Sequence, residues 1–356
     1  MTAVPVVLST GTRAASPGSS GPDATMPVTG PLVDTFGRVH DDLRISVTDR
    51  CNLRCTYCMP ERGMTFLPGT SLLSFDEIVR VADVARGLGV DAVRLTGGEP
   101  LVRRNLDGLV GQLRDLGFAD LSLTTNGMLL TPLLPALVAA GLTRVNVSCD
   151  SLRPERFATI RRRGSLATVL ASMDAAEESG LPPVKVNVVL AYGTNDDEIL
   201  DFASFARETG RVVRFIEFMP LDAQGAWRRD LLVPGSEVVR RIGGRWPLEA
   251  VGGGDDHAPA ERFRFVDGSG EIGVISSVTQ PFCVTCNRLR LTADGAVRNC
   301  LFSDDELDVR DALRTGASDD AIALQLRRAV WGKRPGHGID APGFLRPTRS
   351  MSMIGG

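Results

Sequence analysis

The sequence predicts an α/β fold built around a parallel sheet, and three observations support this. From residue 43 onward, short apolar runs typical of buried strands alternate with longer segments of helical periodicity. The alternation continues through six strand–helix units, an order that produces parallel strands joined by right-handed crossovers. Polar and Gly-rich residues follow the strands at 48–58, 96–100, 124–127 and 148–151, where the carboxyl ends of parallel strands carry a site. Six units are compatible with an open or partial barrel and with a doubly wound sheet.

The individual elements are predicted from periodicity and end signals. Ser74 and Glu77 have the spacing of a capping box and predict the start of a helix. Further helices are expected at Asn105–Leu116 and near 132–140, 154–179 and 196–209. Strands are expected at Leu43–Val47, Ala92–Leu95, Leu121–Thr124, Arg144–Ser148, Val184–Leu190 and Val212–Phe218. After about residue 225, short strands are expected at Phe263–Phe265, Ile272–Ile275 and Leu289–Leu291, followed by a helix at Asp319–Trp331.

The chain is expected to have three regions. Residues 1–36 are rich in Ser, Thr, Pro, Gly and Ala and predict a disordered N-terminal extension. Residues 37–225 hold the strand–helix units, and residues 226–356 form a C-terminal α+β segment.

Composition excludes some classes of protein. Of the 356 residues, 43% are hydrophobic and 23% are charged, as in ordinary globular proteins. No apolar run approaches the roughly 20 residues that span a bilayer, so we expect no membrane association. The net charge of −3 gives no reason to expect a nucleic-acid partner. The basic residues comprise 38 Arg and two Lys, a bias that by itself indicates no phosphate site.

Six of the seven cysteines fall into two triplets. They are Cys51, Cys55 and Cys58, then Cys283, Cys286 and Cys300. In a chain of this size without a secretion signal, this clustering favours metal ligation in a reducing cytoplasm over a disulfide framework. The seventh, Cys149, is interpreted as a small buried residue.

The first triplet suits an iron–sulfur cluster with one open iron. Three thiolates can hold three corners of a [4Fe–4S] cubane and leave the fourth iron for a chelating cofactor. A structural zinc site is the alternative, but it normally has four protein ligands. Gly97, Gly98 and Glu99 follow the second strand, where glycines allow a ligand to approach the backbone and a carboxylate can meet an ammonium group.

The second triplet again offers three cysteines, so a second cluster with an open iron is chemically reasonable, with zinc and a fourth ligand as the alternative. Arg288 and Arg290 follow Cys286 at alternate positions of an extended segment and can face one anion. A solvated strand face is the alternative for these two. The run Arg161-Arg162-Arg163 is most simply a solvated face, or else a loop that helps to close over a substrate.

These motifs resemble the GTP 3′,8-cyclase family of the radical S-adenosylmethionine (radical SAM) superfamily. The resemblance runs from about Gly37 to Gly355-Gly356. It includes Asp41-Asp-Leu-Arg44-Ile-Ser-Val-Thr-Asp-Arg50-Cys51, Arg94-Leu-Thr-Gly-Gly-Glu-Pro, Leu123-Thr-Thr-Asn-Gly127, Asn146-Val-Ser148, Val184-Lys-Val-Asn-Val-Val189 and Arg214-Phe-Ile-Glu-Phe-Met219. The chain departs from the pattern at Cys149, where a larger hydrophobe is usual, and at Ala92, where some members have a basic residue.

The resemblance implies a partial (βα)6 barrel of the TIM type, with a C-terminal α+β segment that carries a second Fe–S site. It also implies the roles of individual residues. Cys51, Cys55 and Cys58 would hold the cluster that binds SAM, and Cys283, Cys286 and Cys300 would hold a second [4Fe–4S] cluster that receives the guanine of GTP. The SAM pocket would include Tyr57, Gly98, Ser148 and Met219. GTP would be bound by Arg44, Arg94, Thr124, Lys185, Arg288, Leu289 and Arg290, with Arg214 adding charge nearby.

The implied activity is that of a lyase in the first step of molybdenum cofactor biosynthesis. The 5′-deoxyadenosyl radical would take the 3′ hydrogen of GTP, and the 3′ carbon would attack guanine C8. An electron and a proton would then give 3′,8-cyclo-7,8-dihydro-GTP. The resemblance further implies a cytoplasmic homodimer, a flavodoxin- or ferredoxin-like electron donor, a functional link to cyclic pyranopterin monophosphate synthase, and a Gly-Gly tail that reaches toward the site. A different radical SAM enzyme with auxiliary clusters and a zinc-stabilised binding protein are the alternatives.

Overall fold

A computed structural model describes residues 26–252 and 257–355. Its strands form one curved, twelve-stranded sheet with the order β12-β11-β10-β1-β2-β3-β4-β5-β6-β9-β8-β7. The strands are β1 Asp42–Ser46, β2 Ala92–Thr96, β3 Asp120–Thr125, β4 Arg144–Ser148, β5 Lys185–Leu190, β6 Val212–Glu217, β7 Leu248–Ala250, β8 Glu261–Phe265, β9 Glu271–Ile275, β10 Arg288–Leu291, β11 Ala296–Arg298 and β12 Glu306–Asp308. The helices are α1 Phe75–Gly87, α2 Leu106–Asp115, α3 Leu130–Ala140, α4 Pro154–Arg161, α5 Leu166–Glu178, α6 Ile199–Thr209, α7 Gly235–Gly243, α8 Arg310–Arg314, α9 Asp319–Trp331 and α10 Met351–Ile354.

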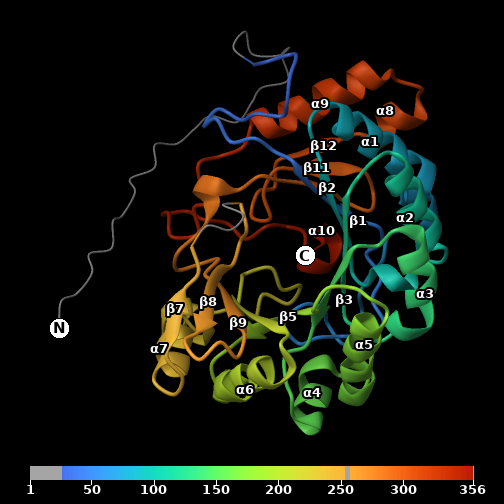
Figure 1. The fold of residues 1–356 in the computed structure, drawn as a ribbon. Helices are drawn as coiled ribbons and strands as arrows, with labels where there is room; N and C mark the ends of the chain where they lie inside the picture. The colour runs from blue at the N-terminus through green and yellow to red at the C-terminus, as the bar shows by residue number, and fades with distance from the viewer. Residues whose placement is uncertain (1–25, 253–256, 356) are drawn as a thin grey trace.

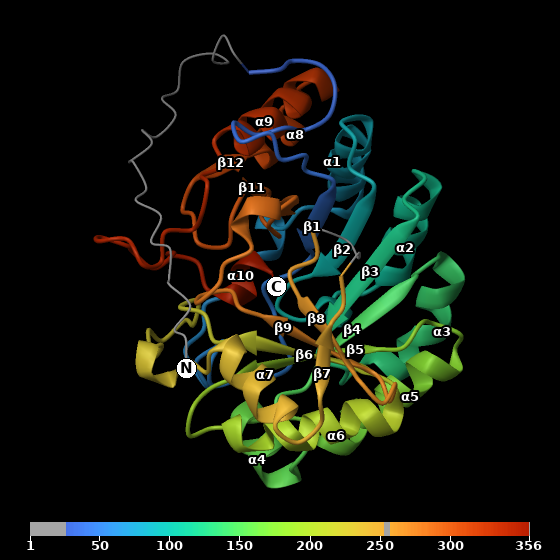
Figure 2. The same cartoon turned by 60° about the vertical axis from the view of Figure 1, so that its left-hand side comes forward.

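The centre of the sheet is a parallel, open barrel. Strands β1 to β6 pair side by side in parallel and in chain order. Figures 1 and 2 show helices along the outer side of this curved sheet, while α10 and the C-terminal end of the chain lie within its curve. The predicted fold class, a partial barrel, is confirmed, and the doubly wound alternative does not apply.

The two faces of each central strand differ in chemistry. Leu43 and Ile45 of β1 belong to the main hydrophobic core, which packs the sheet against the outer helices. Arg44, between them in the chain, points the other way and lines an internal cavity. The same alternation places Leu289 and Leu291 of β10 in the core. The inner face of the barrel therefore carries polar strand residues such as Arg44, together with some apolar ones such as Val189 and Ile216.

The C-terminal segment extends the barrel at both edges. Strand β9 adds in parallel to β6, and β10 adds in parallel to β1. Each addition pairs a strand edge of the six-unit sheet that would otherwise be exposed. The boundary expected near residue 225 therefore does not interrupt the sheet, and this pairing brings the second cysteine triplet to the barrel.

The helix expected near 154–179 is two helices. Helix α4 ends at Arg161, the next residue Arg162 has a left-handed backbone with φ 58°, and Gly164 follows with φ +89°. The Ser165 hydroxyl then accepts a hydrogen bond from the Thr168 backbone N–H and caps α5. A run of three arginines hid this break, because arginine is a good helix former.

The disordered extension expected over residues 1–36 is wrong for residues 26–36, and residues 1–25 lie outside the described part. Leu32 is fully buried in the core, and its backbone N–H donates to the Leu88 carbonyl at 3.1 Å. Arg327 of α9 donates to the carbonyls of Gly30 and Pro31. Two buried apolar side chains, Met26 and Leu32, and these backbone contacts order a segment whose average composition is that of a flexible one.

Within the residues that the structure describes, no helix is long and apolar enough to cross a membrane.

Candidate active site

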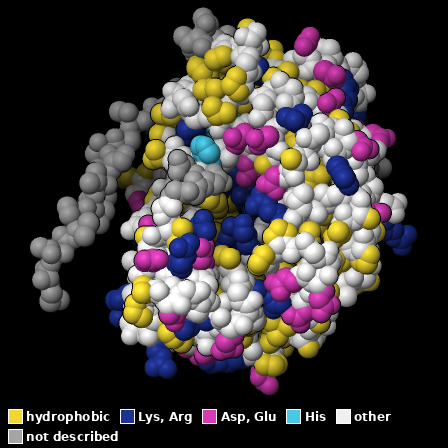
Figure 3. Space-filling view, in the orientation of Figure 1, with side chains coloured by type: hydrophobic (Ala, Val, Ile, Leu, Met, Phe, Trp, Pro, Cys, Tyr) yellow, Lys and Arg dark blue, Asp and Glu magenta, His cyan; other side chains and the backbone are white. Residues whose placement is uncertain are grey.

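A cavity of about 290 Å³ opens inside the barrel and is lined by both cysteine triplets. Figure 3 shows Lys and Arg side chains gathered in a hollow in the middle of this face of the molecule. The predicted site residues that line the cavity are Arg44, Cys51, Cys55, Tyr57, Cys58, Arg94, Gly98, Thr124, Ser148, Met219, Cys283, Cys286, Arg288, Arg290 and Cys300. Segments more than two hundred residues apart in the chain thus converge on one space.

Two predicted ligands do not line this cavity. Lys185 begins β5 on the same strand face as Asn187 and Val189, which do line it, so Lys185 lies one step further along the inner face. Leu289 has its side chain in the core with 1% exposure. A ligand contact from Leu289 would have to come from its backbone.

The first cysteine loop is held against the glycines that follow β2. The Gly98 N–H donates to the Thr48 carbonyl at 2.7 Å, and the Glu99 N–H donates to the Arg50 carbonyl at 2.8 Å. A Cβ on Gly98 would lie 2.5 Å from the Arg50 carbonyl oxygen, so no larger residue fits. The two predicted motifs therefore form one structural unit.

The Glu99 carboxylate connects this unit to the residues at the end of β3. It is 1% exposed and accepts hydrogen bonds from the Thr125 hydroxyl and the Asn126 N–H, both at 2.7 Å. Burial raises the pKa of Glu99 to about 7, although these hydrogen bonds oppose the rise. Glu99 thus has internal partners, and the ammonium group that we considered for it from the sequence is not required.

Arg161 is a site residue that sequence reasoning missed. Its side chain is buried, with one guanidinium nitrogen 2.8 Å from an Asp150 carboxylate oxygen and another 3.3 Å from the Cys55 sulfur. The Tyr57 hydroxyl donates to the same carboxylate at 2.7 Å. Since Arg161 closes over the first triplet, the solvated face favoured for the arginine run is wrong at this residue. Arg161 is the last residue of α4 and lies four positions after the buried Phe157, so it shares the buried face of that helix.

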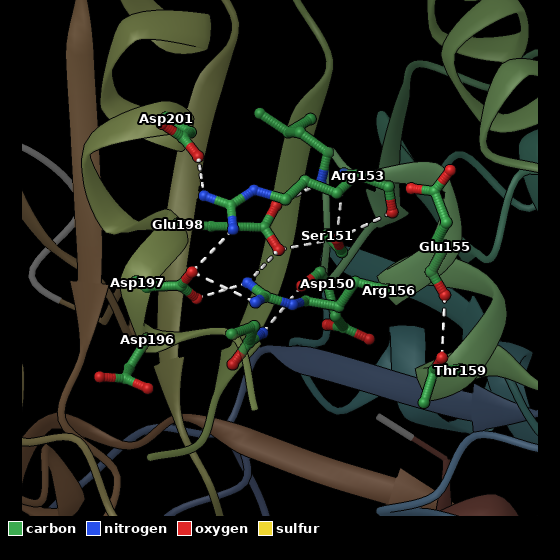
Figure 4. A network of polar contacts seen from close by, with 12 residues as sticks. Asp150, Ser151, Arg153, Glu155, Arg156, Thr159, Asp196, Asp197, Glu198 and Asp201 are labelled. Carbon is green, nitrogen blue, oxygen red and sulfur yellow. Dashed lines mark hydrogen bonds and ion pairs between the residues drawn. The ribbon is translucent and has the colours of Figure 1, made fainter. Parts of the chain in front are cut away.

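The loop that carries Asp150 is fixed by a network around Glu198 (Figure 4). Glu198 is fully buried and accepts from the Ser151 hydroxyl and the Leu152 N–H, both at 2.7 Å. Arg153 adds ion pairs to Asp197 and Asp201 at the surface. This network joins the ends of β4 and β5, so it positions the residues beside Tyr57 without touching the cavity.

Three arginines stand side by side on adjacent strands. Arg44 of β1 is in register with Arg290 of β10 on one side and with Arg94 of β2 on the other. Like charges directly opposite one another in a sheet are destabilising. Asp42 lies 3.6 Å from Arg44, and Asp120 also attracts Arg94, so among the described residues these two carboxylates offset the three cations only in part. The row of three arginines is therefore suited to binding a multiply charged anion.

The electrostatics of these arginines agree with that inference. Burial, and then the charge of Arg94, lower the pKa of Arg44 to about 9. Burial, with Arg44 and Arg288 next, holds the pKa of Arg290 well below its ordinary value. Buried guanidinium nitrogens of Arg44, Arg214 and Arg288 have no hydrogen-bond partner among the described residues. Phosphate oxygens suit such forked donors.

The second triplet is anchored by side chains from both ends of the chain. Arg38 donates to the carbonyls of Cys283 and Arg334 at 2.6 and 2.8 Å. The Lys333 ammonium lies 3.2 Å from the Cys286 sulfur. Burial raises the pKa of Cys286, but the charges of Arg288 and Lys333 outweigh it and bring the pKa to about 6. The nearby positive charges therefore favour the thiolate form of Cys286, which is the form that ligates a metal.

The C-terminal tail closes one side of the cavity. Met351 and Ser352 of α10 line it, and the Gly355 carbonyl accepts a hydrogen bond from Arg290 at 2.8 Å. Gly355 has φ +87°, and a Cβ there would lie 2.8 Å from the Thr96 methyl carbon. The predicted tail thus reaches the site at Gly355, and Gly356 lies outside the described residues.

Cys149 is fully buried, as predicted, and lies in the hydrophobic core and not among the cavity residues. Among the residues with described placement, no three His, Cys, Asp or Glu side chains converge on a point that could hold a single metal ion. In a cubane cluster each thiolate binds a different iron, so the two triplets fit such clusters by donor type, number and shared access to the cavity.

Comparisons with known proteins agree with this architecture. Residues 45–206 match the model of the radical SAM superfamily, and residues 211–339 match the Molybdenum Cofactor Synthesis C model. A GTP 3′,8-cyclase of Streptomyces coelicolor is 52% identical over 328 residues, which cover 91% of this chain and 96% of that protein. GTP 3′,8-cyclase 2 of Mycobacterium tuberculosis is 50% identical over 337 residues, 93% of this chain and 94% of the relative.

Among solved structures, Streptococcus suis SuiB bound to its precursor peptide SuiA superimposes with a TM-score of 0.55. The two share 14% sequence identity, and the match covers 87% of this chain and 66% of SuiB. At this identity the likeness concerns the fold alone.

The partial barrel and the cysteine loop at its inner rim define a radical SAM protein, a class whose members use a [4Fe–4S] cluster and SAM. Two relatives at about half identity over nearly their full length specify the class further. The chain belongs to the GTP 3′,8-cyclase family, which acts at the first step of molybdenum cofactor biosynthesis.

Proposed function

We propose that this chain converts GTP to 3′,8-cyclo-7,8-dihydro-GTP by radical chemistry in its internal cavity. One observation carries the proposal: two open cysteine triplets and an in-register row of arginines line the same cavity. One triplet is suited to generating the radical, and the arginines and the second triplet are suited to holding a nucleoside triphosphate in its reach.

The residues of the first triplet fit a cluster with bound SAM. Cys51, Cys55 and Cys58 would be the ligands, and the Gly98 backbone, Ser148 and Met219 would border the cofactor. When bound, the cluster and SAM supply a 5′-deoxyadenosyl radical that removes the 3′ hydrogen of the GTP ribose. Tyr57 is held by Asp150, so its ring has a fixed orientation beside the triplet.

The arginine row would bind the triphosphate. A triphosphate carries a charge of about −4 at neutral pH, and forked guanidinium donors suit its oxygens. Arg44, Arg94 and Arg290 would surround it, with Lys185 and Arg214 adding charge from β5 and β6 and Thr124 adding a hydroxyl. The ligand would relieve the repulsion that these buried cations now experience.

The second triplet would hold a second [4Fe–4S] cluster on Cys283, Cys286 and Cys300. An open iron there would take the guanine end of GTP and fix the base relative to the ribose. The C-terminal tail would exclude water from the cavity, which matters because a primary carbon radical attacks most neighbouring groups. The 3′ carbon would then be positioned to attack C8, and one electron from the external donor with one proton would complete the product.

Anaerobic reconstitution followed by incubation with SAM, dithionite and GTP tests the proposed function. We expect about eight irons per chain, and formation of 5′-deoxyadenosine together with a cyclised GTP product. Absence of both products from protein that carries both clusters would refute the proposal.

A pair of cysteine variants tests the second cluster. Cys300→Ala should leave about four irons and abolish GTP turnover, while reductive cleavage of SAM persists. Cys149→Ala removes a cysteine that lies in the core outside both triplets, so it should keep the full iron content and activity. Full activity of Cys300→Ala would rule out a role for the second cluster.

The resemblance also supports proposals about the location, the oligomeric state and the protein partners of the enzyme. We propose a cytoplasmic homodimer that receives electrons from a flavodoxin- or ferredoxin-like donor and whose product is used by cyclic pyranopterin monophosphate synthase. Light scattering of the reconstituted protein tests the dimer, and a monomer at micromolar concentration would contradict it.

A further inference from the structure

The side chain of Lys333 reaches the second cysteine triplet from the end of α9. The residue is 5% exposed, and its ammonium donates to the Cys286 sulfur at 3.2 Å and to the Arg288 carbonyl at 3.0 Å. Nothing in the sequence pattern marks it, apart from its being one of two lysines in the chain. The family resemblance assigned it no role.

The electrostatic surroundings of Lys333 contain few compensating charges. Its favourable partners are Cys286 and then Cys300, while Arg38 repels it. Burying an ammonium group is costly unless it has an anionic partner. The ammonium lies within hydrogen-bond distance of a sulfur that would ligate iron, so a cluster on this triplet would supply the negative charge that compensates it.

The first triplet provides an instructive contrast. There Arg161 donates to the Cys55 sulfur at 3.3 Å, but the same guanidinium also pairs with Asp150 at 2.8 Å. The positive charge at the first triplet is therefore offset by a carboxylate. At the second triplet, the other contact of Lys333 is a neutral backbone carbonyl, so its charge acts on the thiolates.

We propose that Lys333 is a positioning residue of the second cluster, which orients the Cys286 thiolate and raises the reduction potential of the cluster. The inference rests on the proposed function, because it requires a cluster at this triplet. Reduction adds an electron to the cluster, and a nearby cation that hydrogen-bonds to a ligating sulfur stabilises the reduced form. Lys333 need not touch GTP to have this effect.

A redox titration of the second cluster alone tests the inference. The full-length chain with Cys51, Cys55 and Cys58 all changed to Ala is the parent, since it retains the second triplet only. Its midpoint potential and its electron paramagnetic resonance spectrum are compared with those of the same parent carrying Lys333→Met. We expect the ratio of reduced to oxidised cluster at a fixed potential to fall about tenfold, which is 59 mV for a one-electron couple.

Two further variants of this parent separate charge from packing. Lys333→Arg keeps the cation and should retain most of the potential. Arg334→Met removes the neighbouring cation, whose exposed side chain pairs with Asp305 at the surface, and should change nothing. If Lys333→Met fails to hold a cluster that Lys333→Arg holds, the positioning role is equally supported.

Other results would overturn the inference. A potential and spectrum of Lys333→Met identical to those of the parent would do so, and so would Lys333→Arg behaving like Lys333→Met. By contrast, a parent that binds no iron at all would refute the second cluster itself. The failure of the inference is thus distinguishable from the failure of the proposed function.

Discussion

At the scale of single residues, the arginine row shows how a binding site can oppose stability. Arg44 stands in register between Arg94 and Arg290, and the free energy of the ligand-free fold includes their repulsion. We expect Arg44→Met to raise the melting temperature of the ligand-free protein by about 1–3 °C, because one of three buried like charges is removed. The same change should raise KM for GTP about tenfold or more, since a charge-assisted contact to phosphate is lost.

Thermal unfolding with and without GTP, together with steady-state kinetics, checks this prediction. Arg228→Met is the control, since Arg228 is exposed and pairs with Asp230, two residues away in the chain. A lower melting temperature for Arg44→Met than for wild type would show that the row is not under electrostatic strain.

Lys185 makes GTP binding depend on pH. Burial, and then repulsion by Arg214, Arg144 and Arg94, lowers its pKa to about 8, and Asp120 only partly offsets this. The charged form attracts phosphate, so kcat/KM for GTP should fall by up to about tenfold between pH 7 and pH 9 as the proton is lost. A lowered lysine pKa also means that the folded state binds fewer protons than the unfolded state. The ligand-free protein should therefore gain stability as pH rises through this range.

The variant Lys185→Arg isolates the contribution of Lys185, because arginine keeps its charge throughout this range. Its kcat/KM for GTP should fall much less between pH 7 and pH 9 than that of the wild type. The same decline in both proteins would assign the pH dependence to another group.

At this scale, the sequence predicted residues whose role is local and missed those whose role depends on distant contacts. The cysteines could be recognised because ligand spacing is a property of one loop. Arg161 and Lys333 could not, since each acts on a cysteine that lies far from it in the chain. Long, flexible side chains leave no periodic signal of where their charged ends lie.

At the scale of elements, the backbone geometry of the C-terminal tail determines a contact in the site, the hydrogen bond between Gly355 and Arg290. Gly355 has a left-handed backbone and leaves no room for a Cβ against Thr96 and Ser46. Gly355→Ala should therefore displace the carbonyl that accepts from Arg290. The strain is of the order of 1–2 kcal/mol, so we expect GTP turnover to fall about tenfold while the iron content stays normal.

Iron analysis and product formation by Gly355→Ala check this prediction, with Gly343→Ala as the matched control. Gly343 also has positive φ, but a Cβ at that position would have no atom within 4 Å. Equal loss of turnover in the two variants would mean that backbone strain anywhere in the C-terminal segment, and not the contact with Arg290, is responsible.

Element prediction succeeded where the signals are strong and local. The capping box at Ser74 and the helix Asp319–Trp331 are present as predicted, and the predicted strand Leu289–Leu291 lies within β10. It failed at 154–179, where arginines concealed a break, and at 26–36, where buried Met26 and Leu32 order a segment of flexible composition. In both cases tertiary contacts outweighed the average tendency of the residues.

At the scale of the whole molecule, the site depends on pairing between the two ends of the chain. Strand β10 joins β1, and this register alone places Arg290 beside Arg44 and the second triplet across the cavity from the first. The sequence contained both motifs, but strand register over such a separation is set by packing, so their convergence could be expected only from the family resemblance.

The proposed chemistry requires that this cavity present the 3′ carbon of GTP to the radical formed at the first triplet. Anaerobic turnover of GTP carrying deuterium at C3′, followed by mass spectrometry of the 5′-deoxyadenosine that is released, tests this requirement. We expect deuterium in the 5′-deoxyadenosine and a cyclised nucleotide product. Formation of 5′-deoxyadenosine without deuterium, by protein with both clusters loaded, would contradict the proposed hydrogen abstraction.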